Sequence, residues 1–266
     1  MSCFFILFFV TFFCTTSSCI SYNATVSLDG KGDYTTIGAA IAAAPNNSDS
    51  RFIIHVKPGM YFEYIKIESS KTFITLKGDD GSTTTIVGNR SQATGFGTAD
   101  SATFVDFIFG NALAVFQDCR IYARLLNNIV TVTAQSKEYK LQLSGISFQN
   151  CSVMASPELG PVNEMIVFLG HPWRDYSTVI FMESFLDSVV NPAGWSEWFN
   201  SSSLKLLFYA EYGNRGSGAN LSERVKWSGF HAIENRKEAT RFSVRQFING
   251  TTWLPVETGV PYRPDL

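Results

Sequence analysis

A strand motif that occurs twice constrains the fold of this chain more than any other feature. The segment Phe116–Cys119 (Phe-Gln-Asp-Cys) returns 32 residues later as Phe148–Cys151 (Phe-Gln-Asn-Cys), and an aliphatic residue follows two positions after each cysteine. A strand motif that returns at such a spacing is typical of stacked coils, as in a parallel β-helix. Two strands of a β-sandwich can share a pattern by coincidence, so the repeat alone leaves that alternative open.

Short apolar runs separated by turn residues fill most of the chain after residue 51. The runs are rich in β-branched and aromatic residues, and few helices are expected between them, which favours a parallel β-helix or another all-β fold over alternating βαβ units. Strands are expected at Phe52–Val56, Phe73–Leu76, Thr83–Val87, Phe104–Phe109, Ala114–Phe116, Ile129–Thr133, Ile146–Phe148, Ile166–Leu169, Val179–Met182 and Leu206–Tyr209.

One amphipathic helix is predicted near the start, over Thr36–Ala44, where the apolar residues follow helical spacing. Thr35 or Thr36 can cap its first turn, and Pro45 ends it. We expect this helix to cover the open end of the first coil, where unpaired strand edges invite aggregation. A second short helix is expected within Glu234–Ile248.

The N-terminus has the pattern of a secretory signal peptide, which we assign to residues 1–21. Residues 3–14 are apolar apart from one threonine, and small polar residues follow them. A membrane anchor is the alternative, but the apolar run is too short to span a bilayer. Residues 22–266 are then expected to form a single secreted domain. Seven Asn-x-Ser/Thr sites suit a glycosylated surface: Asn23, Asn46, Asn89, Asn150, Asn200, Asn220 and Asn249.

Charge and composition exclude several classes of partner. The formal net charge is -2, without the basic excess that nucleic-acid binding needs. The three histidines share no metal-ligand spacing with the cysteines, so no zinc cluster is expected. We expect a monomer that binds neither nucleic acid nor membrane.

Cys119 and Cys151 are the two cysteines outside the expected signal peptide. Stacked coils would bring them within bridging distance, and an oxidising compartment favours a disulfide between them. Two buried free thiols are the alternative.

Two clusters carry the residue types of a catalytic or sugar-binding site. Asp106 is a carboxylate within an apolar strand, and such a group is costly to bury unless it is paired or functional. The segment Gly170–Arg174 combines an imidazole, an indole and a guanidinium, which suits stacking on a sugar acid and pairing with its carboxylate. A solvated aspartate and a turn with a packed tryptophan are the structural alternatives.

Several separate motifs follow one another along the chain: Asp29–Ile37, Val56–Glu63, Asp106–Ala112, Leu169–Trp173, Pro192–Trp198 and Thr258–Tyr262. In these motifs and their order, the chain resembles the plant pectinesterases (pectin methylesterases) over nearly all of residues 22–266. The resemblance implies a secreted, right-handed parallel β-helix that hydrolyses methyl esters of cell-wall homogalacturonan to pectate and methanol, without metal or organic cofactor.

The resemblance also implies roles for individual residues. Asp106 matches the family's nucleophile, which attacks the ester carbonyl to form an acyl-enzyme. Trp173 matches a tryptophan that packs on the sugar, and Thr98 matches a threonine that contacts the substrate. His171 stands where the family has an arginine that orients the nucleophile, and we expect it to regain some positive charge at acidic pH.

The sequence departs from the family between Phe104 and Val105. There the family continues through further strands, which carry two oxyanion glutamines and the acid/base aspartate, whereas this chain passes directly to Asp106. The expected domain is therefore a β-helix shortened by the loss of internal coils. General acid–base help contributes about 10²–10⁴ in rate and one oxyanion donor about 10²–10³, so we expect severely impaired catalysis. A non-catalytic pectin-binding wall protein and a defective truncated product are the alternatives.

Overall fold

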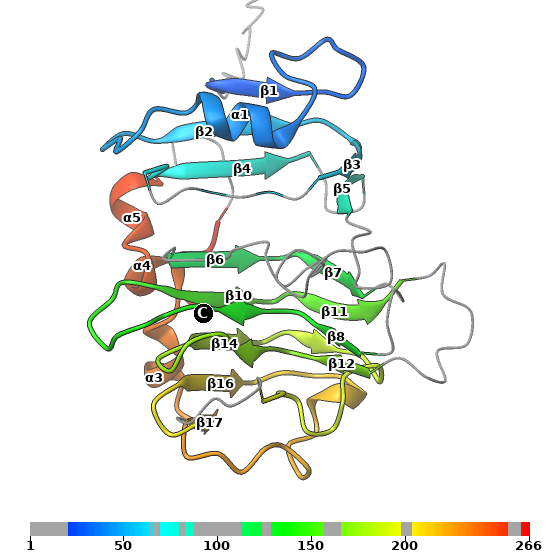
Figure 1. The fold of residues 1–266 in the computed structure, drawn as a ribbon, viewed down its shortest axis with the longest axis vertical. Coiled ribbons are helices and arrows are strands. Elements are labelled where there is room, and N and C mark those ends of the chain that lie inside the picture. The colour runs from blue at the N-terminus through cyan, green and yellow to red at the C-terminus, as the bar shows by residue number, and fades with distance from the viewer. Residues whose placement is uncertain are drawn as a thin grey trace, which may run out of the picture.

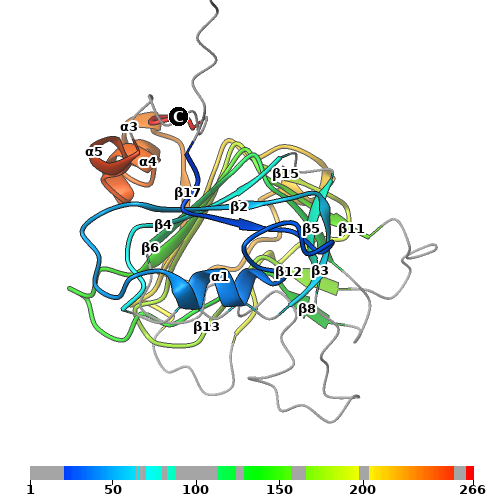
Figure 2. The same ribbon diagram turned by 90° about the horizontal axis from the view of Figure 1, so that it is seen from above.

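The strands of this protein stack in parallel, coil upon coil, into a β-helix (Figure 1). The computed structural model describes residues 21–63, 65, 67, 70–79, 83–87, 113–123, 129–156, 166–197, 204–254 and 262–266. Every strand pair within these ranges is parallel. Seen down the stack, the strands fall into separate walls around a common interior (Figure 2).

The longest wall contains five parallel strands and forms the main sheet of what we call the C-terminal stack, residues 113–254. Its order is β17-β16-β14-β10-β6. The repeated motif occupies β6 and β10, and the register pairs Phe116 with Phe148 and Gln117 with Gln149, which confirms stacked coils. The strands are β6 (Leu113–Gln117), β10 (Gly145–Gln149), β14 (Thr178–Met182), β16 (Phe208–Tyr212) and β17 (Phe230–Ile233).

Each coil of the C-terminal stack turns a corner at the same place, directly after its strand in the main sheet. Asp118, Asn150, Glu183 and Gly213 hold this corner in four successive coils, and all four have φ between 50° and 58°. A left-handed residue at the corner directs the chain into the next wall. That wall contains β7 (Arg120–Ala123), β11 (Ser152–Ala155) and β15 (Phe185–Leu186).

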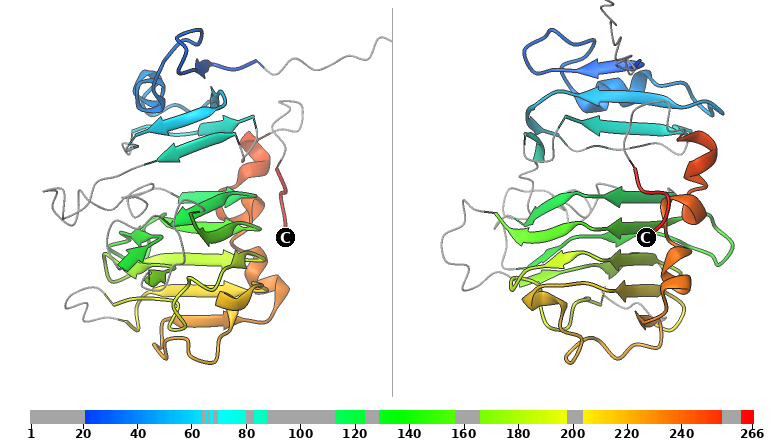
Figure 3. Two further views of the ribbon diagram at one scale, coloured as in Figure 1. Left: turned by 90° about the vertical axis from the view of Figure 1, so that its right-hand side faces the viewer. Right: turned by 180° about the vertical axis from the view of Figure 1, so that it is seen from behind.

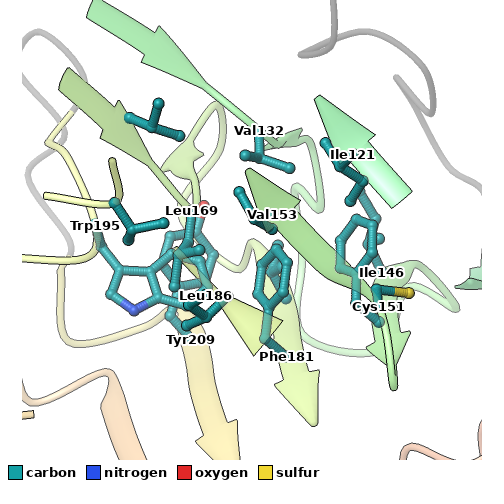
Figure 4. Close-up of a cluster of buried hydrophobic side chains, with 14 of the residues drawn as sticks. Ile121, Val132, Ile146, Cys151, Val153, Leu169, Phe181, Leu186, Trp195 and Tyr209 are labelled. Carbon is teal, nitrogen blue, oxygen red and sulfur yellow. The ribbon is translucent and has the colours of Figure 1, made fainter. Parts of the chain in front are cut away.

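Aromatic side chains form a column inside the C-terminal stack. The rings of Phe116, Phe148 and Phe181 are stacked, with centroids 4.9 Å and 4.4 Å apart. Trp195 continues the column, with its ring edge-on to Phe181 and 4.4 Å from Tyr209. Figure 4 shows the rings of Phe181, Trp195 and Tyr209 among aliphatic side chains from neighbouring coils. Stacked offset rings contribute beyond their buried area, so the repeat stabilises the fold directly.

The N-terminal stack, residues 21–87, is smaller and has its own core. Its sheet has the order β1-β2-β4, with β1 (Ala24–Val26), β2 (Phe52–Val56) and β4 (Ile74–Gly78). β3 (Gly59–Phe62) pairs with β5 (Thr84–Val87) in a second wall. Among the described residues, no strand pair joins β4 to β6, and the buried side chains form separate clusters in the two stacks.

The predicted helix is α1 (Ile37–Ala43), which packs on the first coil. Thr36 caps it by accepting a hydrogen bond from the N–H of Ala39 at 3.2 Å, as the sequence predicts. Ile37 and Ile41 are buried with Ile54 in the core of the N-terminal stack. Figures 1 and 2 show α1 beside β1 and β2 at the end of the stack.

A helical tail follows the last coil and runs along one side of the main sheet (Figures 1 and 3). The expected single helix is divided into α3 (Arg236–Thr240) and α4 (Val244–Phe247), and α5 (Gly250–Trp253) follows. Phe242 stacks on Phe208 of the main sheet, with ring centroids 5.1 Å apart. At the other end of the tail, the ring of Trp253 meets Phe73 edge-on at 5.5 Å. The tail therefore contacts both stacks.

Candidate functional site

The predicted site residues divide into two groups. Asp106 and Thr98 lie outside the described residues, so their expected roles stay predictions. His171 and Trp173 lie on the C-terminal stack, at and directly after the short strand β13 (His171–Pro172). The local structure can therefore be built around these two side chains.

β13 is held by pairing with β9 (Ala134–Gln135) of the preceding coil. The N–H of His171 donates to the carbonyl of Thr133 at 3.0 Å, and the N–H of Trp173 donates to that of Gln135 at 3.1 Å. Gly170 comes directly before, where a Cβ would lie 2.3 Å from the Thr133 hydroxyl oxygen. Only glycine allows this close approach, which sets the path of the backbone into β13.

His171 is a buried, neutral imidazole. Its side chain is buried, and this burial lowers the pKa of His171 from 6.5 to about 4. This shift works against the expectation that the residue regains positive charge at acidic pH, because burial penalises the charged imidazolium. A neutral ring also lacks the charged fork with which arginine holds a carboxylate.

Trp173 is half-buried and lies beside the histidine. The centroids of the two rings are 6.3 Å apart and their planes are inclined by 44°. Its backbone is fixed by the bond to Gln135, while part of its surface stays accessible to solvent. A half-buried indole on a rigid strand end can stack on a sugar ring.

Gln135 is a buried residue that sequence reasoning missed. Its amide nitrogen donates to the Ser144 hydroxyl at 2.5 Å, and its Oε1 accepts from the N–H groups of Lys137 and Thr178 at 3.0 Å and 2.9 Å. It thereby ties the strand under Trp173 to the start of β14. No charge or periodicity distinguishes this glutamine in the sequence, so only the fold reveals its role.

A buried ion pair supports the same part of the stack. Arg224 donates to both carboxylate oxygens of Glu211, at 2.7 Å and 3.1 Å, and Trp195 donates its indole N–H to the same carboxylate at 3.2 Å. Both charged side chains are almost wholly buried. Glu211 is an acidic residue within the apolar run of β16, the same signal that identified Asp106, so the sequence offered a way to find it.

Cys119 and Cys151 lie on neighbouring coils, as the repeat predicts, and both are free thiols in this structure. The hydrogen bond between the two thiols lowers the pKa of Cys119, and the same bond raises that of Cys151. Figure 4 shows Cys151 at the edge of the aromatic and aliphatic core. The two cysteines are close neighbours, and the disulfide between them stays a prediction.

Metal-binding clusters and membrane-spanning helices are both absent from the described ranges. Within them, no group of three or more His, Cys, Asp or Glu side chains is arranged to hold a metal ion. None of the helices in the same ranges has both the length and the apolar character needed to cross a bilayer.

The fold and the β13 region define the class of protein first: a parallel β-helix with an imidazole and an indole at one strand end. The sequence model of the family described as Pectinesterase matches residues 23–105 and 103–251. The chain belongs to the pectinesterase family.

Individual relatives agree with this assignment. The chain is 37% identical over 311 aligned positions to "Probable pectinesterase/pectinesterase inhibitor 39" of Arabidopsis thaliana, covering 91% of this chain and 58% of the relative. It is 35% identical over 309 positions to "Pectinesterase 1" of Solanum lycopersicum, covering 90% of this chain and 56% of the relative. The chain thus spans less than two thirds of the length of these curated relatives.

A solved structure confirms the fold. Pectin methylesterase from carrot is 31% identical and superposes with a TM-score of 0.69, covering 94% of this chain and all of the carrot chain. The enzyme from Aspergillus niger, at 23% identity and a TM-score of 0.53, shares the fold. The expected right-handed parallel β-helix is confirmed.

Proposed function

We propose that this chain is a secreted pectinesterase-family protein that binds methyl-esterified homogalacturonan in the plant cell wall and hydrolyses it only weakly. The family match extends over most of residues 23–251, which supports the substrate class. The apolar segment 3–14 supports export, and residues 1–21 would be removed. In an oxidising wall, the neighbouring thiols of Cys119 and Cys151 would form one disulfide.

Binding would rest on Trp173. Its half-buried indole is anchored at the end of β13 and offers an apolar face to a galacturonate ring. By the family resemblance, Thr98 would contact the same substrate. The net charge of -2 gives no broad attraction for a polyanion, so local contacts have to supply the affinity.

The chemical step would begin at Asp106. Its carboxylate would attack the ester carbonyl carbon, and methanol would leave once its oxygen receives a proton, giving an acyl-enzyme. Water would then hydrolyse that intermediate to pectate and regenerate the aspartate. Both steps need a group that gives and later takes a proton, and the family's acid/base aspartate has no counterpart around Asp106 in this sequence.

The buried His171, at the position of the family's arginine, is the feature of the described residues that supports the proposed impairment. With a pKa of about 4 it is uncharged above about pH 5, so it would not hold the nucleophile by charge. The missing stretch supports the same conclusion. The family model matches in two segments that meet at residues 103–105, and the alignment of 311 positions exceeds the 266 residues of the whole chain.

Methanol release from methyl-esterified pectin tests the proposal, with pectin affinity measured on the same secreted protein. We expect retained affinity that Trp173→Ala weakens, and a turnover at least about 10²-fold below that of the carrot enzyme. Asp106→Asn should abolish any residual release. Turnover close to that of the carrot enzyme would contradict the impairment, and loss of both affinity and a cooperative melt would instead indicate a defective product.

A further inference from the structure

The turn between β16 and β17 contains one Asn-x-Ser site that is exposed to solvent. Asn220, Leu221 and Ser222 are all exposed, and Leu221 retains 39% of its surface although it is apolar. The site directly follows the short 3₁₀ turn Ser217–Ala219. Attachment of an N-linked glycan needs an accessible asparagine side chain and a hydroxyl residue two positions later.

The conformation of this site leaves the reactive atom available. The Oδ1 of Asn220 accepts from the N–H of Ser222 at 3.0 Å, which closes an Asx turn within the site itself. The Nδ2 of Asn220 donates to none of the described residues. The turn brings the two side chains that define the site close together.

The open turn is also rigidly supported from below. Arg224 donates to the backbone carbonyls of Asn220 and Gly218, at 3.1 Å and 2.6 Å, while its guanidinium is held by Glu211. A glycan on Asn220 would therefore be attached to a fixed point on the surface, and no buried contact would have to break.

Asn150 has the same motif and the opposite environment. Its Nδ2 donates to the Asp118 carboxylate at 2.7 Å, and its Oδ1 accepts from Arg215 at 3.3 Å. It also occupies the left-handed corner of its coil, with φ of 50°. A glycan would replace one of the two hydrogens on this nitrogen and would crowd its contact with Asp118 on the neighbouring coil.

The three remaining described sites are exposed as well, but their described contacts include no Asx turn within the motif. The side-chain oxygen of Asn23 accepts from the N–H of Ile53, that of Asn46 accepts from the Ser70 hydroxyl, and Asn249 precedes the buried Gly250. Asn89 and Asn200 lie outside the described residues. Among the described residues, Asn220 is the site at which exposure coincides with an Asx turn closed within the motif.

We propose that Asn220 carries an N-linked glycan and that Asn150 does not. A bond would form between Nδ2 and the anomeric carbon of a lipid-pyrophosphate-linked oligosaccharide. The sugar–phosphate bond would break, the lipid pyrophosphate would leave with the bonding electrons, and the amide proton would pass to the transferase. The inference rests on the proposed secretory route but not on pectin binding or catalysis.

Glycopeptide mapping of the full chain expressed in plant cells tests this assignment. Treatment with peptide-N-glycosidase converts a glycosylated asparagine to aspartate, which marks the site. We expect the mark at Asn220 and none at Asn150. Asn220→Gln and Ser222→Ala should each remove one glycan, and Ser222→Ala keeps the asparagine and its backbone turn. The control Asn150→Gln should remove none, although it costs stability.

An unmodified Asn220, or a glycan at Asn150 of a folded secreted chain, would overturn the assignment. If the chain carries no glycan at all, protease protection in microsomes distinguishes failure to enter the secretory route from an unused site, and either result contradicts the proposal. Pectin affinity and methanol release are measured separately, so failure of the proposed function leaves the glycan result readable.

Discussion

Both stacks of this β-helix consist of parallel strands, but the C-terminal stack has the larger sheet. The C-terminal stack has a five-stranded main sheet, a column of stacked rings and a left-handed corner repeated over four coils. The N-terminal stack has a three-stranded sheet, an aliphatic core and a capping helix. Because each coil contacts mainly its neighbours, the stability of a solenoid is close to a sum of local terms. The two stacks are therefore expected to respond separately to damage.

The candidate site residues are divided between the C-terminal stack and the sequence that precedes it. His171 and Trp173 belong to the C-terminal stack, whereas Thr98 and Asp106 come from the part of the sequence between the stacks. The proposed missing coils would belong at this same place, between Phe104 and Val105. A chain that keeps both stacks can keep its family fold and still lack the residues that transfer a proton.

The largest effect is expected from cavities in the two cores. Phe148→Ala removes the middle ring of the column and should cost about 3–5 kcal/mol, and Ile54→Ala in the N-terminal core about 2–5 kcal/mol. Hydrogen exchange should show each variant losing protection in its own stack. Equal loss of protection across both stacks in either variant would show that the two stacks unfold as a single cooperative unit.

The pH dependence of His171 should be the next largest effect. Burial lowers its pKa from 6.5 to about 4, so the unfolded chain binds this proton more tightly. Above pH 6.5 the neutral ring makes its full contribution to the free energy of unfolding. This contribution falls by about 3 kcal/mol in all as the pH drops towards 4. Urea unfolding should show that the free energy of unfolding decreases less between pH 7 and pH 4 in His171→Gln than in the unsubstituted protein. Identical decreases in both proteins would mean that His171 is not buried as a neutral group.

A smaller effect is expected where the tail meets the N-terminal stack. Trp253→Leu and Phe73→Leu each remove one ring of the edge-on pair, and a double-mutant cycle should give a coupling of about 1 kcal/mol. Protection from hydrogen exchange should fall in β2 and β4 more than in β14. A coupling near zero would mean that the tail does not hold the N-terminal stack.

The smallest effect concerns the repeated corner. Glu183→Gly places glycine where the next coil already has Gly213, and relief of the left-handed conformation should stabilise the protein by about 0.5–1 kcal/mol. Asn150→Gly is the matched control, because it also loses the bonds to Asp118 and Arg215. A gain in thermal stability from Asn150→Gly as large as that from Glu183→Gly would show that those side-chain bonds contribute little.

The sequence predicted the parts of the fold that local signals determine. Nine of the ten apolar runs correspond to β2, β4, β5, β6, β8 (Ile129–Thr131), β10, β12 (Ile166–Phe168), β14 and β16, and Thr36 caps α1 as expected. The tenth run, Phe104–Phe109, lies outside the described residues. The two-residue strands β9, β13 and β15 were not predicted, because they form only when a neighbouring coil supplies their hydrogen bonds. The division of the tail into short helices also depends on packing against the sheet.

The sequence predicted the residue types of the candidate site but not the charge state of its histidine. His171 and Trp173 were identified from a short motif, and the structure places their rings 6.3 Å apart. The neutrality of His171 follows from burial by distant parts of the chain, which no local pattern records. Likewise, Arg224 lies 13 residues from Glu211, and only the turn between β16 and β17 brings the two together.

We propose that this polypeptide lacks the family's acid/base coils between its two stacks. Sequencing the transcript across the codons for Phe104 and Val105 would decide whether those coils are encoded. We expect the two codons to adjoin. An additional in-frame stretch that encodes the family's Gly-Tyr-Gln-Asp motif would contradict it, and would leave His171 as the remaining departure from an active pectinesterase.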